Sequence, residues 1–126
     1  MHQISESELI LMKIIWKNGG TALFSYIMEQ LEQEHSEWKK NTVLTLLSRL
    51  IGKHYLTAKK LGRRNEYIAV VSEQEYQSEQ THVFLDRVYE GNVKNLVTSL
   101  LSQDSLTETD WTELESFWKE KTKKNE

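Results

Sequence analysis

The chain has 126 residues, a formal net charge of −3 and no cysteine. This length allows one compact domain or two small ones, and the absence of cysteine excludes disulfides and cysteine-based metal or redox sites. No apolar stretch approaches the roughly 18 residues that a membrane span needs, and the polar start lacks the pattern of a secretory leader. We therefore expect a soluble, cytoplasmic protein.

The start of the chain predicts two helices. Ser5 and Glu8 have the spacing of a capping box, and the apolar face that follows them ends at Gly19-Gly20. Thr21 is expected to cap a second helix, whose apolar positions extend to Leu31. The polar run "EQEHSE" marks the end of this second helix.

The third predicted helix has the clearest amphipathic pattern of the chain. Its apolar residues recur at the spacing of a single buried face, namely Val43, Leu46, Leu47, Leu50 and Ile51. The opposite side is narrow and carries small polar residues, with Leu44 and Arg49 on its flanks. Capping rules favour Asn41 as the N-cap. A helix with such a slim outer side fits a DNA major groove about 12 Å wide.

A cationic β-hairpin follows the third helix. Residues 55–59 and 66–71 are rich in strand-forming residues, and "LGRRN" supplies the turn between them. Residues 38–64 hold eight Lys or Arg and no Asp or Glu, although the whole chain is acidic. Because a polyanion responds to the local potential, this cluster outweighs the net charge. Three helices followed by a hairpin predict a winged helix-turn-helix domain over residues 1–71.

The pattern of residues 72–126 predicts a helical region. Ser72 with Glu75, and Thr107 with Asp110, have capping spacing, and Gly91 separates the helices between them. Their wide apolar stripes lack an obvious internal core, so we expect a two-fold dimer; the alternative is that they fold back onto the first domain. The expected dimerisation residues are Val93, Leu96, Val97, Leu100, Leu101, Trp111, Leu114, Phe117 and Trp118.

The predicted fold class is thus mostly α with a small β-hairpin wing: a winged helix-turn-helix domain followed by a helical dimerisation region. The predicted partner is double-stranded DNA, with phosphates neutralising the wing. The candidate DNA-binding residues are Lys39, Lys40, Asn41, Thr42, Leu44, Thr45, Arg49, Lys53, Arg63 and Arg64. No catalytic motif, cofactor motif or metal-ligand spacing is present, so we expect neither an enzyme nor a metalloprotein.

With these elements placed, nearly the whole chain resembles the BlaI/MecI family of penicillinase and methicillin-resistance repressors. The residues that carry the likeness are "ISESEL", "NTVLTLLSRLIGKHYL", "EYIAVVSEQEY", "FLDRVYEGNVKNLVTSLL" and "LTETDWTELESFW". The resemblance implies a dimeric repressor of a palindromic operator. It also implies helix contacts at Asn41, Thr42, Thr45 and Arg49, wing contacts at Arg63 and Arg64, and relief of repression by a sensor-protease pathway for β-lactams.

The sequence departs from this family at several positions. Lys39-Lys40 stands where relatives often have Ser-Pro, and Leu44 stands where they carry a basic residue. The cleaved Asn-Phe bond of the relatives falls at Ser99-Leu100, which is the candidate proteolysis site here. A copper-responsive branch has a C-terminal cysteine cluster that this chain lacks.

Two other functions remain open from the residues alone. One is a winged-helix regulator of the MarR type, gated by a small molecule. The other is a winged-helix module that binds proteins and not DNA; it would need large apolar anchors on the outer side of the third helix, where only Leu44 qualifies.

Overall fold

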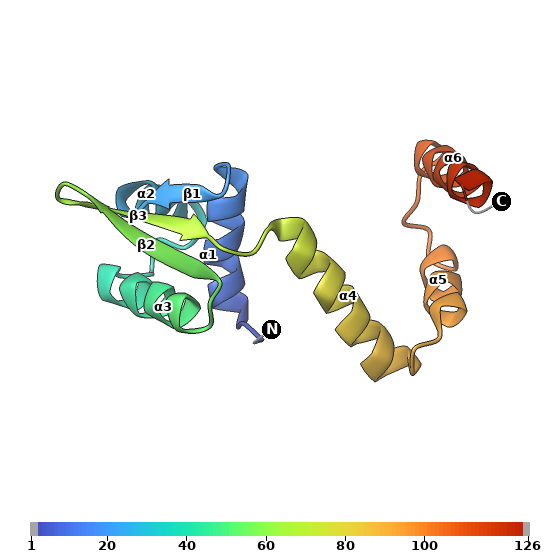
Figure 1. The fold of residues 1–126 in the computed structure, drawn as a ribbon, viewed down its shortest axis with the longest axis horizontal. Helices are drawn as coiled ribbons and strands as arrows, with labels where there is room; N and C mark the ends of the chain where they lie inside the picture. The colour runs from blue at the N-terminus through green and yellow to red at the C-terminus, as the bar shows by residue number, and fades with distance from the viewer. Residues whose placement is uncertain (1–2, 125–126) are drawn as a thin grey trace. The chain divides into compact units, whose positions relative to one another are not determined.

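The computed structural model describes residues 3–124 and divides into two compact units, the first ending at Ser78 and the second beginning at Glu79. The first unit contains three helices and a three-stranded antiparallel sheet (Figure 1). Its elements are α1 (Glu6–Lys17), β1 (Thr21–Leu23), α2 (Phe24–Glu34), α3 (Lys40–Gly52), β2 (Leu56–Leu61), β3 (Arg64–Ala69) and the first turn of α4 (Glu73–Tyr89). This is the predicted winged helix-turn-helix.

The capping box predicted for α1 is confirmed. Glu8 N–H donates to Ser5 Oγ at 3.1 Å, and Ser5 N–H donates to Glu8 Oε1 at 3.0 Å. The helix ends before Gly19 and Gly20, whose φ angles of 80° and 92° lie in the left-handed region that favours glycine. The two glycines therefore end α1 as expected.

The prediction that Thr21 caps the second helix is wrong. Thr21 lies in the short strand β1, and α2 begins at Phe24 with Leu23 as an N-cap that makes no side-chain hydrogen bond. β1 pairs with β3, with Thr21 opposite Ile68 and Leu23 opposite Glu66. The partner strand lies more than 40 residues further along the chain, so no local signal reveals this pairing.

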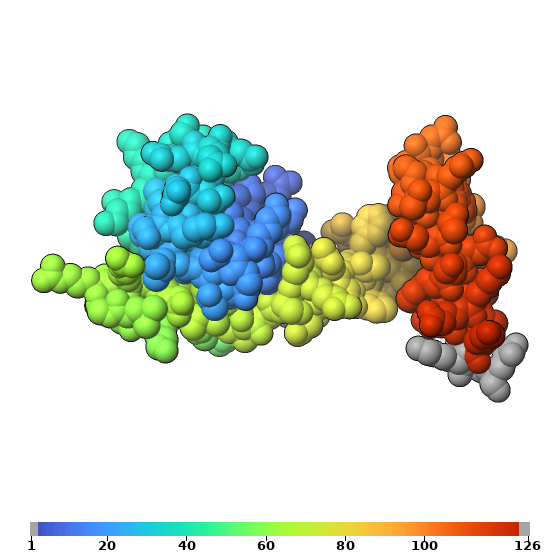
Figure 2. Space-filling view, turned by 90° about the horizontal axis from the view of Figure 1, so that it is seen from above, coloured from blue at the N-terminus to red at the C-terminus, as the bar shows by residue number. Residues whose placement is uncertain are grey.

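The predicted hairpin is present, with strands that reach further toward the turn than expected. β3 is the central strand of the order β1-β3-β2, and Leu61 pairs with Arg64 around a two-residue turn, Gly62-Arg63. Gly62 has a φ of 65°, as the first central position of a tight hairpin turn requires. We call the hairpin of β2 and β3 the wing. Its tip projects from the body of the first unit (Figure 2).

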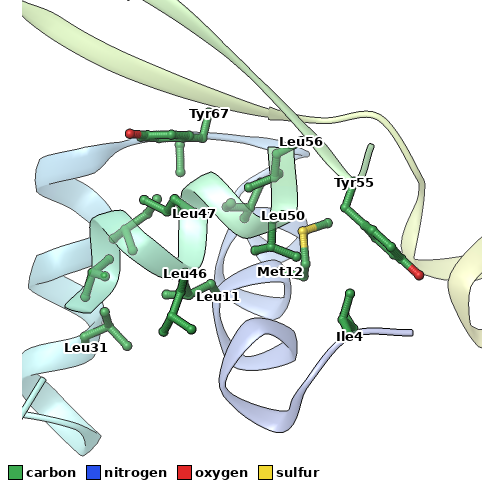
Figure 3. Packing of buried hydrophobic residues seen from close by; sticks show 14 residues of the cluster. Ile4, Leu11, Met12, Leu31, Leu46, Leu47, Leu50, Tyr55, Leu56 and Tyr67 are labelled. Carbon is green, nitrogen blue, oxygen red and sulfur yellow. The ribbon is translucent and has the colours of Figure 1, made fainter. Parts of the chain in front are cut away.

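The hydrophobic core of the first unit lies between α1, α2, α3 and the sheet. Figure 3 shows Leu47 and Leu50 of α3 packed among Leu11 and Met12 of α1 and Leu56 of the sheet. Of the five apolar residues predicted on the buried face of α3, four are buried and Ile51 is half-buried. Each large side chain buried here contributes about 1.5–3 kcal/mol.

The first turn of α4 packs on the first unit. Trp16 Nε1–H donates to the Val71 carbonyl at 2.8 Å, and the Trp16 ring lies 5.6 Å from the Tyr76 ring. Ser72 Oγ accepts the Glu75 N–H at 3.1 Å, so the predicted cap at Ser72 is present. Because Tyr76 also packs edge-on against buried Tyr55, the start of α4 is anchored.

The second unit contains the rest of α4, α5 (Val93–Leu101) and α6 (Glu108–Lys124). The predicted break at Gly91 is confirmed by its φ of 80°. The predicted cap of the last helix is also present, because Thr107 and Asp110 exchange reciprocal hydrogen bonds of 3.0 and 3.1 Å. None of the helices within residues 3–124 combines the length and hydropathy of a membrane span.

A partly buried ion pair joins the start of α1 to the end of α3. Lys53, the C-cap of α3, donates from Nζ to Glu8 Oε1 at 2.9 Å and to the Gln3 carbonyl at 3.0 Å. The Glu8 side chain is only 3% exposed. Burial by itself raises the pKa of this carboxyl, but the hydrogen bonds from Ser5 and Lys53 and the charge of Lys53 outweigh burial and lower the pKa below its ordinary value.

This lowered pKa makes stability depend on pH. A carboxyl whose pKa is lower in the folded state stabilises the fold above its unfolded pKa, about 4.3, and that contribution disappears as the pH falls through the folded pKa. At neutral pH we expect Glu8→Gln to lower the free energy of unfolding by about 2 kcal/mol, because a hydrogen-bonded charge is lost. Below about pH 4 the difference from the wild type should shrink.

Urea unfolding at fixed protein concentration across this pH range measures the effect. Glu6→Gln is the matched control, because it removes a negative charge from an exposed position on the same helical turn. The interpretation fails if the loss caused by Glu8→Gln is the same at pH 3 as at neutral pH.

Candidate nucleic-acid interface

The outer side of α3 presents small polar side chains to solvent. Asn41, Thr42, Thr45 and Arg49 are exposed, and Leu44 is half-buried. Thr45 Oγ1–H donates to the Asn41 carbonyl at 2.9 Å, so the only hydroxyl proton of Thr45 is used within the helix. In this arrangement Thr45 can accept a hydrogen bond or offer its methyl group, whereas phosphate oxygens need a donor.

The start of α3 is positively charged. The helix begins at Lys40 with Lys39 as its N-cap, so the expectation that Asn41 is the N-cap is wrong. The first turn holds no acidic residue, and Lys39 and Lys40 are both exposed. Because a helix N-terminus carries a partial positive charge from the aligned peptide dipoles, the two lysines add to a potential that attracts anions.

The wing carries four cations, and the pairing of its strands fixes the side on which they lie. Lys60 pairs with Asn65 and Lys59 with Glu66, while Arg63 occupies the turn. Leu56 is buried, and side chains alternate along a strand, so Lys60 lies on the same face of the sheet as Leu56. Its partner Asn65 lines the groove next to α3, so Lys60 and Asn65 are additional candidate contacts. The alternation of side chains along the strand from Leu56 could have identified Lys60 in the sequence.

A shallow groove joins α3 to the wing. Its volume is about 370 Å³. It is lined by Leu23, Phe24, Ser25, Lys40, Leu44, Arg63, Arg64 and Asn65. These residues include three cations and no carboxylate. The structure thus brings together the predicted contacts Lys40, Leu44, Arg63 and Arg64, which are up to 24 positions apart in the sequence.

Lys53 stands apart from this group. Its ammonium bonds to Glu8 and to the Gln3 carbonyl, and its side chain is 30% exposed. These two protein partners take two of the three donors of the ammonium and direct it toward α1. Because this ammonium is directed at Glu8 and Gln3, we leave Lys53 out of the proposed DNA-contact set.

Among the residues that the structure describes, no three His, Asp or Glu side chains are grouped in a way that could hold a metal ion. The pKa values of Tyr67 and Tyr76 are raised by burial alone. Both tyrosines belong to the packing of the first unit, where Tyr67 is buried and Tyr76 contacts Trp16.

The predicted dimerisation residues lie on α5 and α6 of the second unit. Leu96 is half-buried, and eight others are at least 40% exposed: Val93, Val97, Leu100, Leu101, Trp111, Leu114, Phe117 and Trp118. Of the candidate cleavage residues, Ser99 is half-buried and Leu100 is exposed, and both lie inside α5. The second unit thus leaves a large apolar surface uncovered within a single chain.

Comparisons with known proteins agree with this geometry. A family model described as "Penicillinase repressor" matches residues 4–120. The penicillinase repressor of Bacillus licheniformis is 35% identical over 125 residues, which cover 98% of this chain and 96% of that protein.

Two solved structures resemble part of the chain. The DNA-binding domain of the repressor BlaI has a TM-score of 0.53 at 35% identity, covering 59% of this chain and 88% of the other. The monomeric form of B. licheniformis BlaI in complex with the blaP half-operator has a TM-score of 0.51 at 35% identity, covering 60% and 89%.

The match of the family model across most of the chain confirms the resemblance found in the sequence. It also confirms the prediction of a regulator and not an enzyme, because the family consists of transcriptional repressors. The chain belongs to the penicillinase repressor family.

Proposed function

We propose that this protein is a transcriptional repressor that binds double-stranded DNA through α3 and the β2–β3 wing. The observation that carries the proposal is the cation-lined groove between α3 and the wing, next to a helix whose outer side is slim and polar. A surface of this shape and charge fits a major groove flanked by phosphates. The relative BlaI, solved with the blaP half-operator, supports the same partner.

The proposed contact residues fall into two groups, those that suit base edges and those that suit the DNA backbone. Asn41 can pair with adenine through two hydrogen bonds, and Thr42, Leu44 and Thr45 can contact base edges or thymine methyl groups. Lys39, Lys40 and Arg49 suit phosphates, which position the protein without reading sequence. Arg63 and Arg64 of the wing suit the adjacent backbone or a narrow minor groove.

The alternative of a protein-binding module finds little support on α3. Large apolar anchors are typical of the centre of a protein interface, and the outer side of α3 carries only half-buried Leu44 among polar side chains. A regulator gated by a small molecule would show a melting temperature that rises with its ligand.

We further propose that the protein acts as a homodimer in the cytoplasm. The exposed apolar residues of α5 and α6 support self-association, because patches of this kind in a monomer mark interaction sites. A two-fold dimer would bind a palindromic operator whose half-sites lie about 10 bp apart or at a small multiple of that spacing.

The family resemblance extends the proposal to relief of repression by a sensor-protease pathway. The bond between Ser99 and Leu100 takes the place of the Asn-Phe bond cleaved in relatives, and here it lies inside α5. Since proteases bind extended chain, α5 must first unfold locally. No residue of α5 is fully buried within the single chain, so little packing inside the protomer opposes that unfolding.

The wing assignment is tested by its salt dependence. We expect the pair Arg63→Ala and Arg64→Ala to weaken binding of every duplex alike and to reduce the slope of log K against log salt by up to about 2, because two phosphate contacts are lost. Electrophoretic shift titrations at several salt concentrations, with a duplex selected from random sequence, measure both quantities.

The matched control for the wing is Lys13→Ala with Lys17→Ala, which removes two exposed positive charges from α1, away from the groove. The control should keep the wild-type slope. If the wing pair lost sequence preference and kept the full salt slope, the assignment to phosphate would be refuted.

The role of Asn41 is tested by base discrimination. We expect Asn41→Ala to lose about 1–3 kcal/mol of preference at one base pair of each half-site and to leave the other positions unchanged. A panel of duplexes with single base-pair substitutions measures this preference. Uniform weakening across the panel would show that Asn41 does not read a base.

The dimer is tested with a charge on the apolar surface of α6. Trp118 is 68% exposed in the single chain, so Trp118→Glu should leave the protomer folded and shift sedimentation from dimer to monomer at micromolar concentration. Thr109→Glu places the same charge at an exposed polar position of α6 and should stay dimeric. A monomeric wild type would contradict the proposal.

A further inference from the structure

α3, the helix that enters the major groove in the proposed function, is held mainly by apolar packing. Four of its side chains enter the core, and its N-cap, Lys39, makes no side-chain hydrogen bond to the helix start. Burial of one face sets the rotation and the approximate tilt of the helix, because core side chains interdigitate. A directional bond from another element restricts the tilt of the helix further.

The ion pair between Glu8 and Lys53 supplies this directional bond. Lys53 ends α3, and its ammonium reaches Glu8 Oε1 at 2.9 Å and the Gln3 carbonyl at 3.0 Å, both at the start of α1. Glu8 Oε1 is held in turn by Ser5 N–H at 3.0 Å. One carboxylate oxygen thus links the capping box of α1 to the last residue of the α3 region.

The length of α3 makes its orientation important for DNA binding. A helix of 13 residues is about 20 Å long, so a tilt of about 5° at one end displaces the other end by roughly 2 Å. Recognition geometry tolerates displacements of about 0.5 Å. Lys53 lies one turn after Arg49, whose carbonyl accepts the Lys53 N–H at 2.9 Å, so the anchored end is continuous with the exposed face.

Burial of Glu8 offsets part of the stability that the pair contributes, because the carboxylate is desolvated. The second oxygen, Glu8 Oε2, is buried and has no hydrogen-bond partner among the described residues, so desolvation of the carboxylate is only partly compensated. Buried ion pairs of this kind can often be replaced by neutral side chains of similar volume without loss of stability.

We propose that Glu8 and Lys53 are positioning residues, which fix the orientation of α3 and thereby set the selectivity for the operator without touching DNA. This inference rests on the proposed function, since it assigns α3 to the major groove. It replaces the expectation that Lys53 binds phosphate, and the two roles differ in their effect on salt dependence.

The decisive variant is Glu8→Gln combined with Lys53→Met. It keeps the net charge of the protein, and glutamine can still accept from Ser5 N–H as capping boxes allow. We expect operator affinity to fall about 10-fold, comparable to the loss of one good base contact. Affinity for scrambled DNA and the slope of log K against log salt should stay unchanged, because no phosphate contact is removed.

The measurements are operator and scrambled-duplex affinities at several salt concentrations, at a temperature where circular dichroism shows each variant folded. A merely structural role would lower the melting temperature and leave the ratio of the two affinities unchanged. Lys53→Arg keeps the charge and the donors, so it should restore most of this ratio. If the double variant does not fold, Glu8→Gln alone replaces it, since Lys53 is 30% exposed and can reach water.

Two results would overturn the inference. One is an unchanged affinity ratio in the folded double variant. The other is a salt slope that falls by about 0.9 in Lys53→Met, which would show a direct phosphate contact. A wild type that ignores duplex DNA in dilute salt would instead refute the proposed function, and the inference with it.

Discussion

The burial of one face of α3 is the constraint on which the rest of the first unit depends. Val43, Leu46, Leu47 and Leu50 are buried, so each turn of the helix commits its apolar side to the core. What remains outside is a narrow strip that has no packing requirement of its own. Small polar residues can occupy that strip without loss of stability, and small residues are what a groove about 12 Å wide admits.

The wing adds a second requirement, because its cations repel one another and must find negative charge. Glu66 lies opposite Lys59 and offsets part of that repulsion within the sheet. Arg63 and Arg64 have no carboxylate beside them in the groove that they line with Lys40. DNA phosphates, which form a continuous polyanion, would complement this positive charge.

Much of this architecture is visible in the sequence because it is written in local signals. The caps at Ser5, Ser72 and Thr107 each depend on residues three positions apart, and all three are present in the structure. The buried face of α3 also follows from spacing alone. In a local pattern of this kind the interacting residues are close in sequence, so the pattern can be recognised without knowledge of the fold.

The elements that the sequence did not reveal are those whose partners lie far away. β1 forms because Thr21–Leu23 pairs with β3, and Thr21 on its own resembles a helix cap. Lys53 follows a DNA-binding pattern in the sequence, yet in the fold its ammonium meets Glu8, 45 positions earlier. Lysine is compatible with both partners, so only the three-dimensional packing of α1 against the end of α3 distinguishes them.

The basic and acidic side chains are unevenly distributed between the two parts of the chain. Residues 1–71 carry 10 basic and 7 acidic side chains, whereas residues 72–126 carry 6 and 12. An acidic region is repelled by phosphates at separations up to about a Debye length, near 8–10 Å at physiological salt. The acidic half therefore disfavours binding of DNA by any surface other than the basic one, even though the whole chain has a net negative charge. A moderately acidic isoelectric point is thus compatible with a DNA-binding protein, because the excess of basic side chains is confined to residues 1–71.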